Sequence, residues 1–417
     1  MYCGSCIRDN TLATALTRKG HDVTLLPLYT PTRTDEENVS QQRVFFGGIS
    51  VYLEQYVSLF RKTPWLLDRL WESPWLLKAV SGRAVGTSPT QLGSLAVSVL
   101  EGTHGHQRKE LDKLVHWLKD QPRPDVLDIS NSMLIAIAEP LKQALGCPIN
   151  CTLQGENIFM DGLLEPYRSR AKELIRSHVQ HVDSFVAVSD YYAGYMSRYL
   201  QIPGAKMRVV PLGVNVDRFQ PSGRETTGQL TMGYLGRMAP EKGIHLLCDA
   251  FRDLRERGAL ANCRIELAGY LGPEHKAYWQ SIEREVKSWG LADDVHYRGE
   301  LALDAKVAFL QGLDLFVVPA VYDDPKGMSL IEAMACGVPV VAPRRGTYTE
   351  VLERTGGGVL VDPENLEQLE TTLEQLSGDP ERLAELGRRA RAGIEEQYGT
   401  DEMATRTLDV YERLTSR

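Results

Sequence analysis

Two carboxylates, Asp324 and Glu332, flank the start of an expected short helix, one in the loop before it and one inside it. The backbone N–H groups at this helix start belong to Gly327, Met328, Ser329 and Leu330. Free N–H groups and the positive end of a helix dipole favour phosphate, whereas carboxylates repel phosphate and accept hydrogen bonds from sugar hydroxyls. The turn therefore predicts a site for a ligand with both phosphate and hydroxyl groups, such as a nucleotide sugar.

A second loop carries two basic residues, Arg237 and Lys242, and begins at Gly236, directly after an expected strand. A guanidinium and an ammonium group on one loop suit the clamping of a diphosphate. An isolated pair of basic loop residues is more often solvated. Because the pair occurs together with Asp324 and Glu332, we interpret it as functional.

The elements that must position these groups are a strand and a helix. The apolar run at residues 313–320 is typical of a buried parallel strand. Ser329 is a favourable N-cap, and Glu332 completes a capping-box pattern, while Gly337 and Pro339 end the helix. Glu332 cannot both reach back to the Ser329 N–H and face a ligand, and the helix-start context favours the ligand role.

The whole chain follows the strand–helix alternation that is typical of parallel α/β sheets. We expect strands within residues 21–28, 125–130, 148–154, 183–190, 229–236, 263–269, 294–299, 313–320, 338–343 and 356–361. At 417 residues the chain is long for one core, which favours two domains. We expect residues 1–212 to form the first domain, residues 213–400 the second, and residues 401–417 a final helix.

The segment from Asp324 to Pro339, DPKGMSLIEAMACGVP, resembles the E-x7-E signature of retaining GT-B glycosyltransferases, especially glycosyltransferase family 4. Asp324 stands where Glu is usual. The segment at residues 207–219 is similar to the interdomain segment of that family. The resemblance implies an α/β GT-B fold with two Rossmann-like doubly wound domains, a cleft between them, and a C-terminal helix that crosses back to the first domain.

The resemblance also implies a reaction and its catalytic residues. Arg237 and Lys242 match the basic pair that contacts the donor pyrophosphate, and they would neutralise the leaving diphosphate. Asp324 would contact the transferred sugar. The implied activity is sugar transfer with retention at the anomeric carbon, by front-face displacement, from a UDP-, GDP- or ADP-linked donor to an unidentified acceptor.

Further donor contacts follow from the same resemblance. Glu332 would bind the ribose hydroxyls, and Tyr270 and Arg298 would lie near the nucleobase. The sequence contains no D-x-D triplet, which favours charge neutralisation by basic residues, and we expect neither a metal nor a cofactor. Two alternatives stay open: another GT-B activity, such as a nucleotide-sugar epimerase or a phosphorylase, and a non-catalytic module that binds sugar nucleotides.

The acceptor side is expected at the carboxyl end of the strand at residues 148–154, where open α/β sheets place ligands. Gln154 and Glu156 follow this strand, and Gln154 occupies a position that often carries His in the family. An amide can still hold a sugar hydroxyl, although a purely structural role is equally compatible. We assign Gly4, in the opening loop, to the same side.

The chain opens with Cys3-Gly-Ser-Cys6 directly before a helical pattern at residues 8–18. A doubly wound sheet normally begins with a strand, so we expect the first strand to be missing through a truncated or misassigned start. The two cysteines fit a redox pair at a helix N-terminus. The interpretation that we favour is a small-residue loop that permits close approach of a ligand.

The composition excludes several classes of protein. A net charge of −8 argues against nucleic-acid binding, and no apolar run reaches the length of a membrane span. The seven cysteines, an odd number, favour reduced thiols in the cytoplasm.

An aromatic segment at residues 54–117 carries Trp65, Trp71 and Trp75 among basic residues, after an expected hairpin at Gly47-Gly48. Such a segment fits peripheral contact with the inner face of a membrane. The alternative, a helical insertion packed on the domain core, is the one that we favour, since Trp is a common core anchor.

Overall fold

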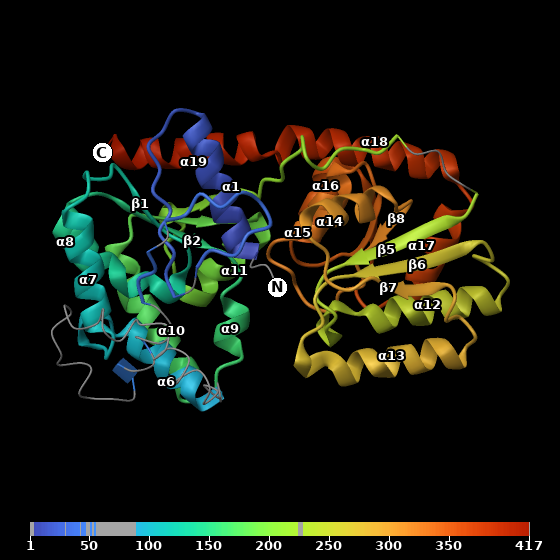
Figure 1. Ribbon diagram of the computed structural model, residues 1–417, viewed down its shortest axis with the longest axis horizontal. Helices are drawn as coiled ribbons and strands as arrows, with labels where there is room; N and C mark the ends of the chain where they lie inside the picture. The colour runs from blue at the N-terminus through green and yellow to red at the C-terminus, as the bar shows by residue number, and fades with distance from the viewer. Residues whose placement is uncertain are drawn as a thin grey trace.

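The computed structural model describes residues 4–29, 31–41, 43–46, 51, 54–55, 89–223 and 228–416. The predictions for Cys3, for the hairpin at residues 47–48 and for the tryptophans of the aromatic segment lie outside these residues. Figure 1 shows two α/β halves side by side, the first in blue to green and the second in yellow to orange. Among the described helices, none is both long and apolar enough to cross a bilayer.

The first half is built on a parallel sheet with the strand order β1-β2-β3-β4. Its strands are β1 Leu127–Ile129, β2 Ile149–Leu153, β3 Ser184–Ala187 and β4 Met207–Val209. Every residue of β2 and β3 is buried, as expected where helices cover both faces of a parallel sheet. The helices of this half are α1 Gly4–Arg18, α6 Pro89–Leu100, α7 Arg108–Lys119, α8 Ala138–Leu145, α9 Asn157–Asp161, α10 Tyr167–His178 and α11 Asp190–Leu200.

The predicted strand at residues 21–28 is wrong. Residues 21–27 have no regular secondary structure, and Leu28 makes only an isolated bridge with Phe45. Two local features disfavour the hydrogen bonding of a β-strand here. Pro27 has no N–H to donate, and Tyr29 has a left-handed backbone with φ of 69°.

The second half is built on a larger parallel sheet with the order β10-β9-β8-β5-β6-β7. Its strands are β5 Leu230–Leu235, β6 Cys263–Ala268, β7 Val295–Tyr297, β8 Leu315–Val317, β9 Val340–Pro343 and β10 Gly358–Val361. The order reverses between β5 and β8, which is the switch point where doubly wound sheets place their ligands. The expected α/β architecture with two parallel sheets is confirmed, and among the described strands the order reverses only in the second sheet.

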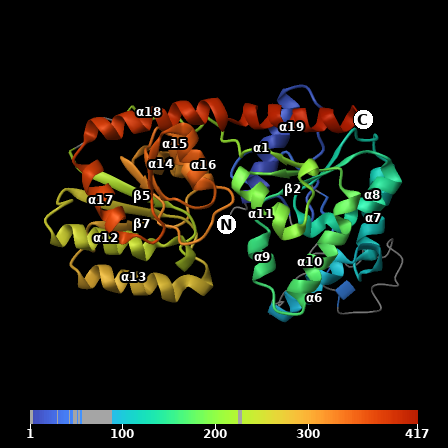
Figure 2. The same ribbon diagram turned by 180° about the vertical axis from the view of Figure 1, so that it is seen from behind.

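The helices that follow β5 lie around the second sheet, except the last, α19, which packs on the first half. They are α12 Ile244–Glu256, α13 Lys276–Ser288, α14 Leu303–Gln311, α15 Met328–Ala335, α16 Gly346–Thr355, α17 Leu366–Ser377, α18 Pro380–Gln397 and α19 Thr400–Thr415. In Figures 1 and 2, α18 and α19 run in red across both halves.

The return of the chain to the first half is confirmed by the packing of α19. Leu12 and Leu16 of α1 form one buried cluster with Met403 and Val410 of α19. The Tyr411 hydroxyl also donates to Asp128 Oδ2 at 2.8 Å. Helix α19 therefore ties the two halves together at the edge of the first sheet.

The segment that joins the halves is held by one guanidinium group. Arg391 of α18 donates to the carbonyl oxygens of Phe219 at 2.5 Å, Ala335 at 2.6 Å and Val216 at 3.1 Å. Its side chain is only 17% exposed. Because carbonyls that lose a buried donor stay desolvated without a partner, this contact is costly to remove.

We therefore expect Arg391→Ala to lower the free energy of unfolding by about 2 kcal/mol or more, measured by urea denaturation. The matched control is Arg388→Ala on the same helix, whose side chain is 69% exposed and pairs with Glu385. That control should change stability by less than about 0.5 kcal/mol. Equal losses for the two variants would contradict the role given to Arg391.

Candidate functional site

The loops after β5 and β8 meet at the switch point of the second sheet. Lys242 Nζ lies 3.1 Å from Asp324 Oδ2 and 2.5 Å from the Tyr322 hydroxyl. The side chains of Lys242 and Asp324 are 15% and 13% exposed. The structure thus brings together a cation and an acid that the sequence separates by a whole strand–helix series.

Asp324 is held by several donors at once. Its carboxylate accepts hydrogen bonds from Lys242 Nζ, the hydroxyls of Tyr322 and Tyr348, and the backbone N–H groups of Lys326 and Gly327. Burial acts to raise the pKa of Asp324, but the nearby Lys242 charge and these hydrogen bonds outweigh it and hold the pKa well below its ordinary value. Asp324 is therefore an ionised, fixed carboxylate.

The start of α15 differs from the prediction. Gly327, not Ser329, is the N-cap, with a left-handed φ of 64°, and no described side chain caps the helix. The reason is that Asp324 Oδ1 binds the N–H groups of Lys326 and Gly327 and so turns the chain before the helix begins. A side chain at position 327 would also meet Thr347 Cγ2 at 2.9 Å. The amide groups that open α15 keep the direction along the helix axis that an anion site requires.

Glu332 makes no capping box. It is 6% exposed, and its Oε1 accepts a hydrogen bond from Lys306 Nζ at 2.7 Å. The same Nζ lies 2.8 Å from Asp35 Oδ2 in the first half. Burial raises the pKa of Glu332, and the Lys306 charge partly offsets this effect. Glu332 therefore faces a hollow between the halves that Thr11, Asp35, Asn215, Lys306 and Met328 also line.

Arg237 shares the loop of Lys242 but has another partner. Its Nη2 lies 2.8 Å from Glu241 Oε1, and its side chain is 40% exposed. The Gly236 N–H donates to the Ala268 carbonyl at 3.0 Å, so this amide is committed to the neighbouring strand. The guanidinium group is thus beside the site and exposed, without contacting Asp324.

The two residues expected near a nucleobase lie on adjacent loops. Arg298, after β7, makes two bonds to Glu266, at 2.6 and 2.9 Å, which fix its orientation. The Tyr270 carbonyl, after β6, accepts from the Met238 N–H at 2.9 Å and joins its loop to the basic loop. Both residues therefore stand at the carboxyl edge of the sheet.

Gly4, expected on the acceptor side, begins α1 opposite the Asp324 loop. Lys326 Nζ binds Ser5 Oγ at 2.9 Å, and a Cβ on Gly4 would lie 3.7 Å from the same Nζ. Gly155, after β2, comes equally near, because a Cβ there would lie 3.0 Å from Pro325 Cγ. The carboxyl edges of the two sheets therefore face each other across this loop.

Gln154 and Glu156 serve the loops of the first half. Gln154 is 4% exposed, and its Nε2 donates to Asp9 Oδ1 at 3.0 Å and to the Ser130 carbonyl at 2.9 Å. Glu156 accepts from both the N–H and the hydroxyl of Ser132. These bonds support the structural alternative for Gln154, and Glu156 likewise joins the loops after β1 and β2.

Sequence reasoning missed the groups that surround the acids. Tyr322 lies two residues before Asp324, so the motif itself contained the signal. Tyr348, Lys306 and Asp35 reach the site from distant segments, and no local pattern marks them.

Two family models match this chain. Residues 215–393 match the family model described as Glycosyl transferases group 1. Residues 96–218 match the model described as Glycosyltransferase Family 4. The two matches overlap at residues 215–218 and together span both sheets.

Among curated proteins, an MMP alpha-(1->4)-mannosyltransferase from Mycolicibacterium hassiacum is 28% identical over 249 residues, which is 59% of this chain and 57% of the relative. The chain thus spans little more than half the length of this relative.

Solved structures share the fold at low identity. HepE from Anabaena, in complex with UDP, is 17% identical with a TM-score of 0.63, covering 75% of this chain and 84% of that chain. A glycosyltransferase from Rickettsia africae ESF-5 is 15% identical with a TM-score of 0.62, covering 94% of this chain and 99% of that chain. The fold is therefore GT-B.

The low pKa of Asp324 gives a stability prediction. The pKa of Asp324 is lower in the folded state than in the unfolded state, where it is about 3.9. The ionised carboxylate therefore stabilises the fold above the unfolded-state pKa. This stabilisation is lost as the pH falls through the folded-state pKa. We expect Asp324→Asn to cost about 1–3 kcal/mol at pH 7. The difference from wild type should shrink below about pH 4.

The measurement is urea unfolding across pH, with Asp323→Asn as control. Asp323 is adjacent but exposed, so its variant should stay within about 0.5 kcal/mol of wild type. A cost for Asp324→Asn that is constant from pH 7 to pH 3 would disprove the depressed pKa.

Proposed function

The chain belongs to glycosyltransferase family 4, and on that premise we propose that it transfers a sugar, with retention at the anomeric carbon, from a nucleoside-diphosphate sugar to an acceptor. The observation that carries the proposal is the meeting of Lys242 with the ionised Asp324 at the uncapped start of α15. This arrangement joins an anion site to a hydroxyl acceptor within one turn.

The diphosphate is placed at the start of α15, with Lys242 and Arg237 nearby. In the transfer, the bond from the anomeric carbon to the diphosphate oxygen breaks and negative charge develops on that oxygen. Helix N–H groups and fixed cations placed where charge appears supply a large part of catalysis in many enzymes. Arg237 is 40% exposed and forms an ion pair with Glu241. Its guanidinium group can turn toward this charge.

Asp324 is proposed to accept a hydrogen bond from the transferred sugar. Its carboxylate is already fixed by Lys242, two tyrosines and two backbone amides, so it orients a hydroxyl without a cost in side-chain entropy. In front-face displacement, the acceptor hydroxyl oxygen bonds the anomeric carbon on the face that the diphosphate leaves. The hydroxyl proton passes to the departing phosphate oxygen.

Glu332 is proposed to bind the ribose. Its carboxylate faces the hollow between the halves and is steadied by Lys306. Arg298 and Tyr270, on the neighbouring loops, are proposed to border the base. The complex of HepE with UDP supports a pyrimidine donor, and the mannosyltransferase relative supports a mannose donor, so a panel of UDP-, GDP- and ADP-sugars is the proper test.

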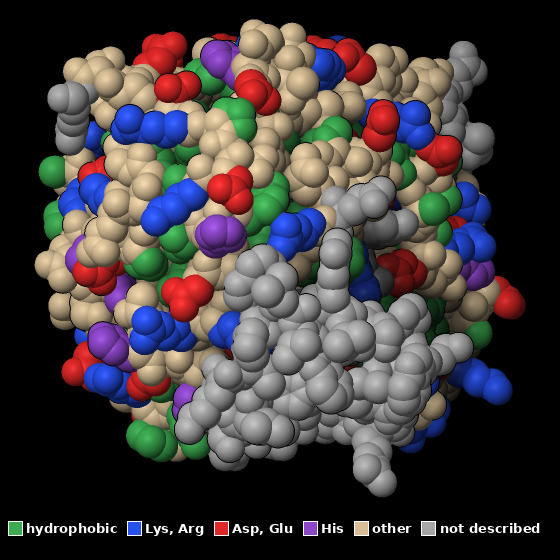
Figure 3. Space-filling model, turned by 60° about the vertical axis from the view of Figure 1, so that its left-hand side comes forward, with side chains coloured by type: hydrophobic (Ala, Val, Ile, Leu, Met, Phe, Trp, Pro, Cys, Tyr) green, Lys and Arg blue, Asp and Glu red, His purple; other side chains and the backbone are tan. Residues whose placement is uncertain are grey.

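Metal independence and location are part of the proposal. The sequence has no D-x-D triplet and offers Lys242 and Arg237 as the cations at the site. The odd number of cysteines continues to favour a cytoplasmic compartment, with peripheral membrane contact through residues 54–117 as the finer hypothesis. Figure 3 shows basic and acidic side chains interspersed over the described part of one face.

A second candidate is a module that binds the donor without transfer. The observation in its favour is that Asp324 is one methylene shorter than the usual Glu and already accepts five hydrogen bonds. A carboxylate so fully used has little remaining capacity for a sugar hydroxyl.

The experiment begins with a thermal-shift panel of nucleotide sugars, because a bound donor raises the unfolding temperature. With the selected donor, release of nucleoside diphosphate is then measured. We expect Lys242→Ala and Arg237→Ala to lower kcat by about 100-fold or more.

The matched control is Lys287→Ala, an exposed lysine at the end of α13, which should keep wild-type turnover. A donor that binds to wild type but is never hydrolysed or transferred would establish the binding module instead. Unchanged turnover in both Lys242→Ala and Arg237→Ala would remove the proposed role of the basic loop.

A further inference from the structure

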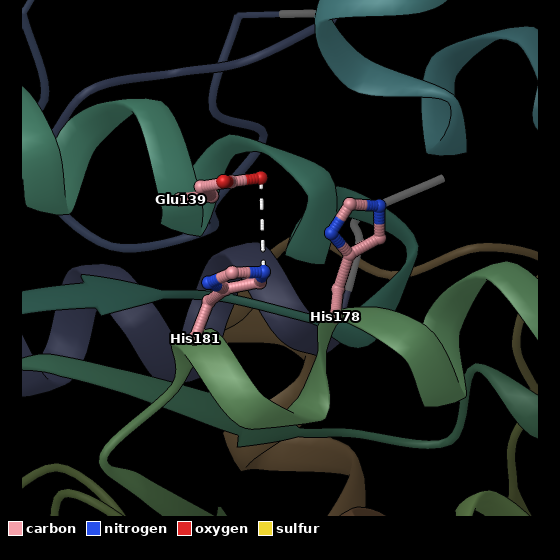
Figure 4. A group of neighbouring side chains, drawn as sticks. All are labelled: Glu139, His178 and His181. Atoms are coloured by element: carbon pink, nitrogen blue, oxygen red, sulfur yellow. Dashed lines mark ion pairs between the residues drawn. The ribbon is translucent and has the colours of Figure 1, made fainter.

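Three side chains that could ligate a metal face one another in the first half, away from the candidate functional site. Glu139, His178 and His181 each offer one ligand atom, and these atoms all lie within 4.8 Å of one another. Figure 4 shows the three side chains converging from two segments. Glu139 lies in the first turn of α8, His178 ends α10, and His181 ends the short 3-10 helix η4 Val179–His181.

The spacing of the two histidines follows from the turn that joins them. In a 3-10 helix the side chains of residues i and i+3 eclipse each other. His178 is the N-cap of η4 and His181 its last residue, so their rings project to the same side, with centroids 6.0 Å apart. Lys206 Nζ fixes this turn by donating to the Val179 carbonyl at 3.0 Å and the Val182 carbonyl at 2.6 Å.

The hydrogen bonding of His178 leaves a lone pair directed at this group. Its Nε2 lies 3.1 Å from the Leu100 carbonyl oxygen, which can only accept, so the ring proton is on Nε2 and the lone pair on Nδ1. That Nδ1 is buried and has no hydrogen-bond partner among the described residues. A backbone carbonyl that holds the distal N–H is the usual support of a metal-binding histidine.

The carboxylate is oriented in a similar way. Glu139 Oε1 accepts from Gln143 Nε2 at 3.3 Å, while Oε2 lies 3.6 Å from His181 Nε2. An ion pair between Glu139 and His181 would explain that contact alone. That ion pair would not provide a partner for the buried Nδ1 of His178, which faces the same gap in Figure 4.

We propose that Glu139, His178 and His181 form a binding site for one divalent transition-metal ion. Two imidazole nitrogens and one carboxylate oxygen suit Zn²⁺, with water as the fourth ligand. Metal bonds of about 2.0–2.1 Å require ligand atoms about 3.3 Å apart, so the partly exposed side chains of the group would move closer on binding. The side chains of His181 and Glu139 are 26% and 43% exposed.

The position of the site indicates a structural role. His181 lies before β3, at the amino end of the strand, whereas the candidate functional site follows the carboxyl ends of the strands. A bound ion would join α8 to the junction of α10 and β3. Metal that binds only the folded chain adds to stability by mass action. The site does not depend on the proposed glycosyl transfer.

The test uses the full chain after removal of metals with a chelator. Isothermal titration with ZnCl₂ should show that one ion binds per chain. In a thermal melt, added ZnCl₂ should raise the unfolding temperature. Outer-shell partners alone are worth about 10- to 100-fold in metal affinity, so His178→Ala and Glu139→Gln, which each remove a ligand, should weaken binding by at least about 100-fold.

The control is His116→Ala, which removes an exposed histidine that lies 3.9 Å from Asp120. It should keep one ion per chain at wild-type affinity. Glu139→Gln alters a side chain that is 43% exposed, so it remains informative if His178→Ala fails to fold. Absence of stoichiometric Zn²⁺ binding in the wild type, or equal binding in wild type and Glu139→Gln, would overturn the proposal.

Discussion

The ion pair between Lys242 and Asp324 is the constraint on which the candidate site depends. It joins the loop after β5 to the loop after β8, the two neighbouring strands at which the sheet order reverses. Because both side chains are nearly buried, each requires the other, and losing one would leave an uncompensated charge in a region of low dielectric. The ion pair therefore also fixes the turn that starts α15, since the same carboxylate binds the amides of Lys326 and Gly327.

The loop of this acid is held from the first half as well. The Ser189 hydroxyl donates to the Pro325 carbonyl at 3.0 Å, and Lys326 binds Ser5. Lys306 extends the connection by joining Glu332 to Asp35 across the hollow. These polar contacts add to apolar packing between the halves, because one buried cluster contains both Tyr192 of the first half and Tyr348 of the second.

The opposite ends of the first sheet serve different purposes. At the carboxyl ends, Gln154 and Glu156 use their polar atoms to hold loops in place for whatever binds between the halves. At the amino ends, the turn from α10 to β3 is fixed by Lys206 and carries the two histidines of the proposed metal site. Helix α19 adds a tie at the edge, through Tyr411 and Asp128.

The two-sheet architecture, most strands and the final helix could be predicted from the sequence. These features follow from buried apolar runs, from glycines and prolines at their ends, and from the rule that parallel strands place their following loops at one edge. Sequence reasoning misassigned residues 21–28, where Pro27 and the left-handed Tyr29 outweigh an apolar pattern.

The hydrogen-bond partner of each polar group depends on the tertiary packing of distant segments. Ser329 is an excellent N-cap by type, yet Asp324 turns the chain first and Gly327 takes that position. Glu332 accepts a hydrogen bond from Lys306, and buried Gln154 donates one to Asp9. Both partners are distant in the sequence and are brought close only by the fold. Local patterns report backbone preference and burial. The choice among hydrogen-bond partners depends on distances between distant segments, and these exist only once both sheets and α19 are assembled.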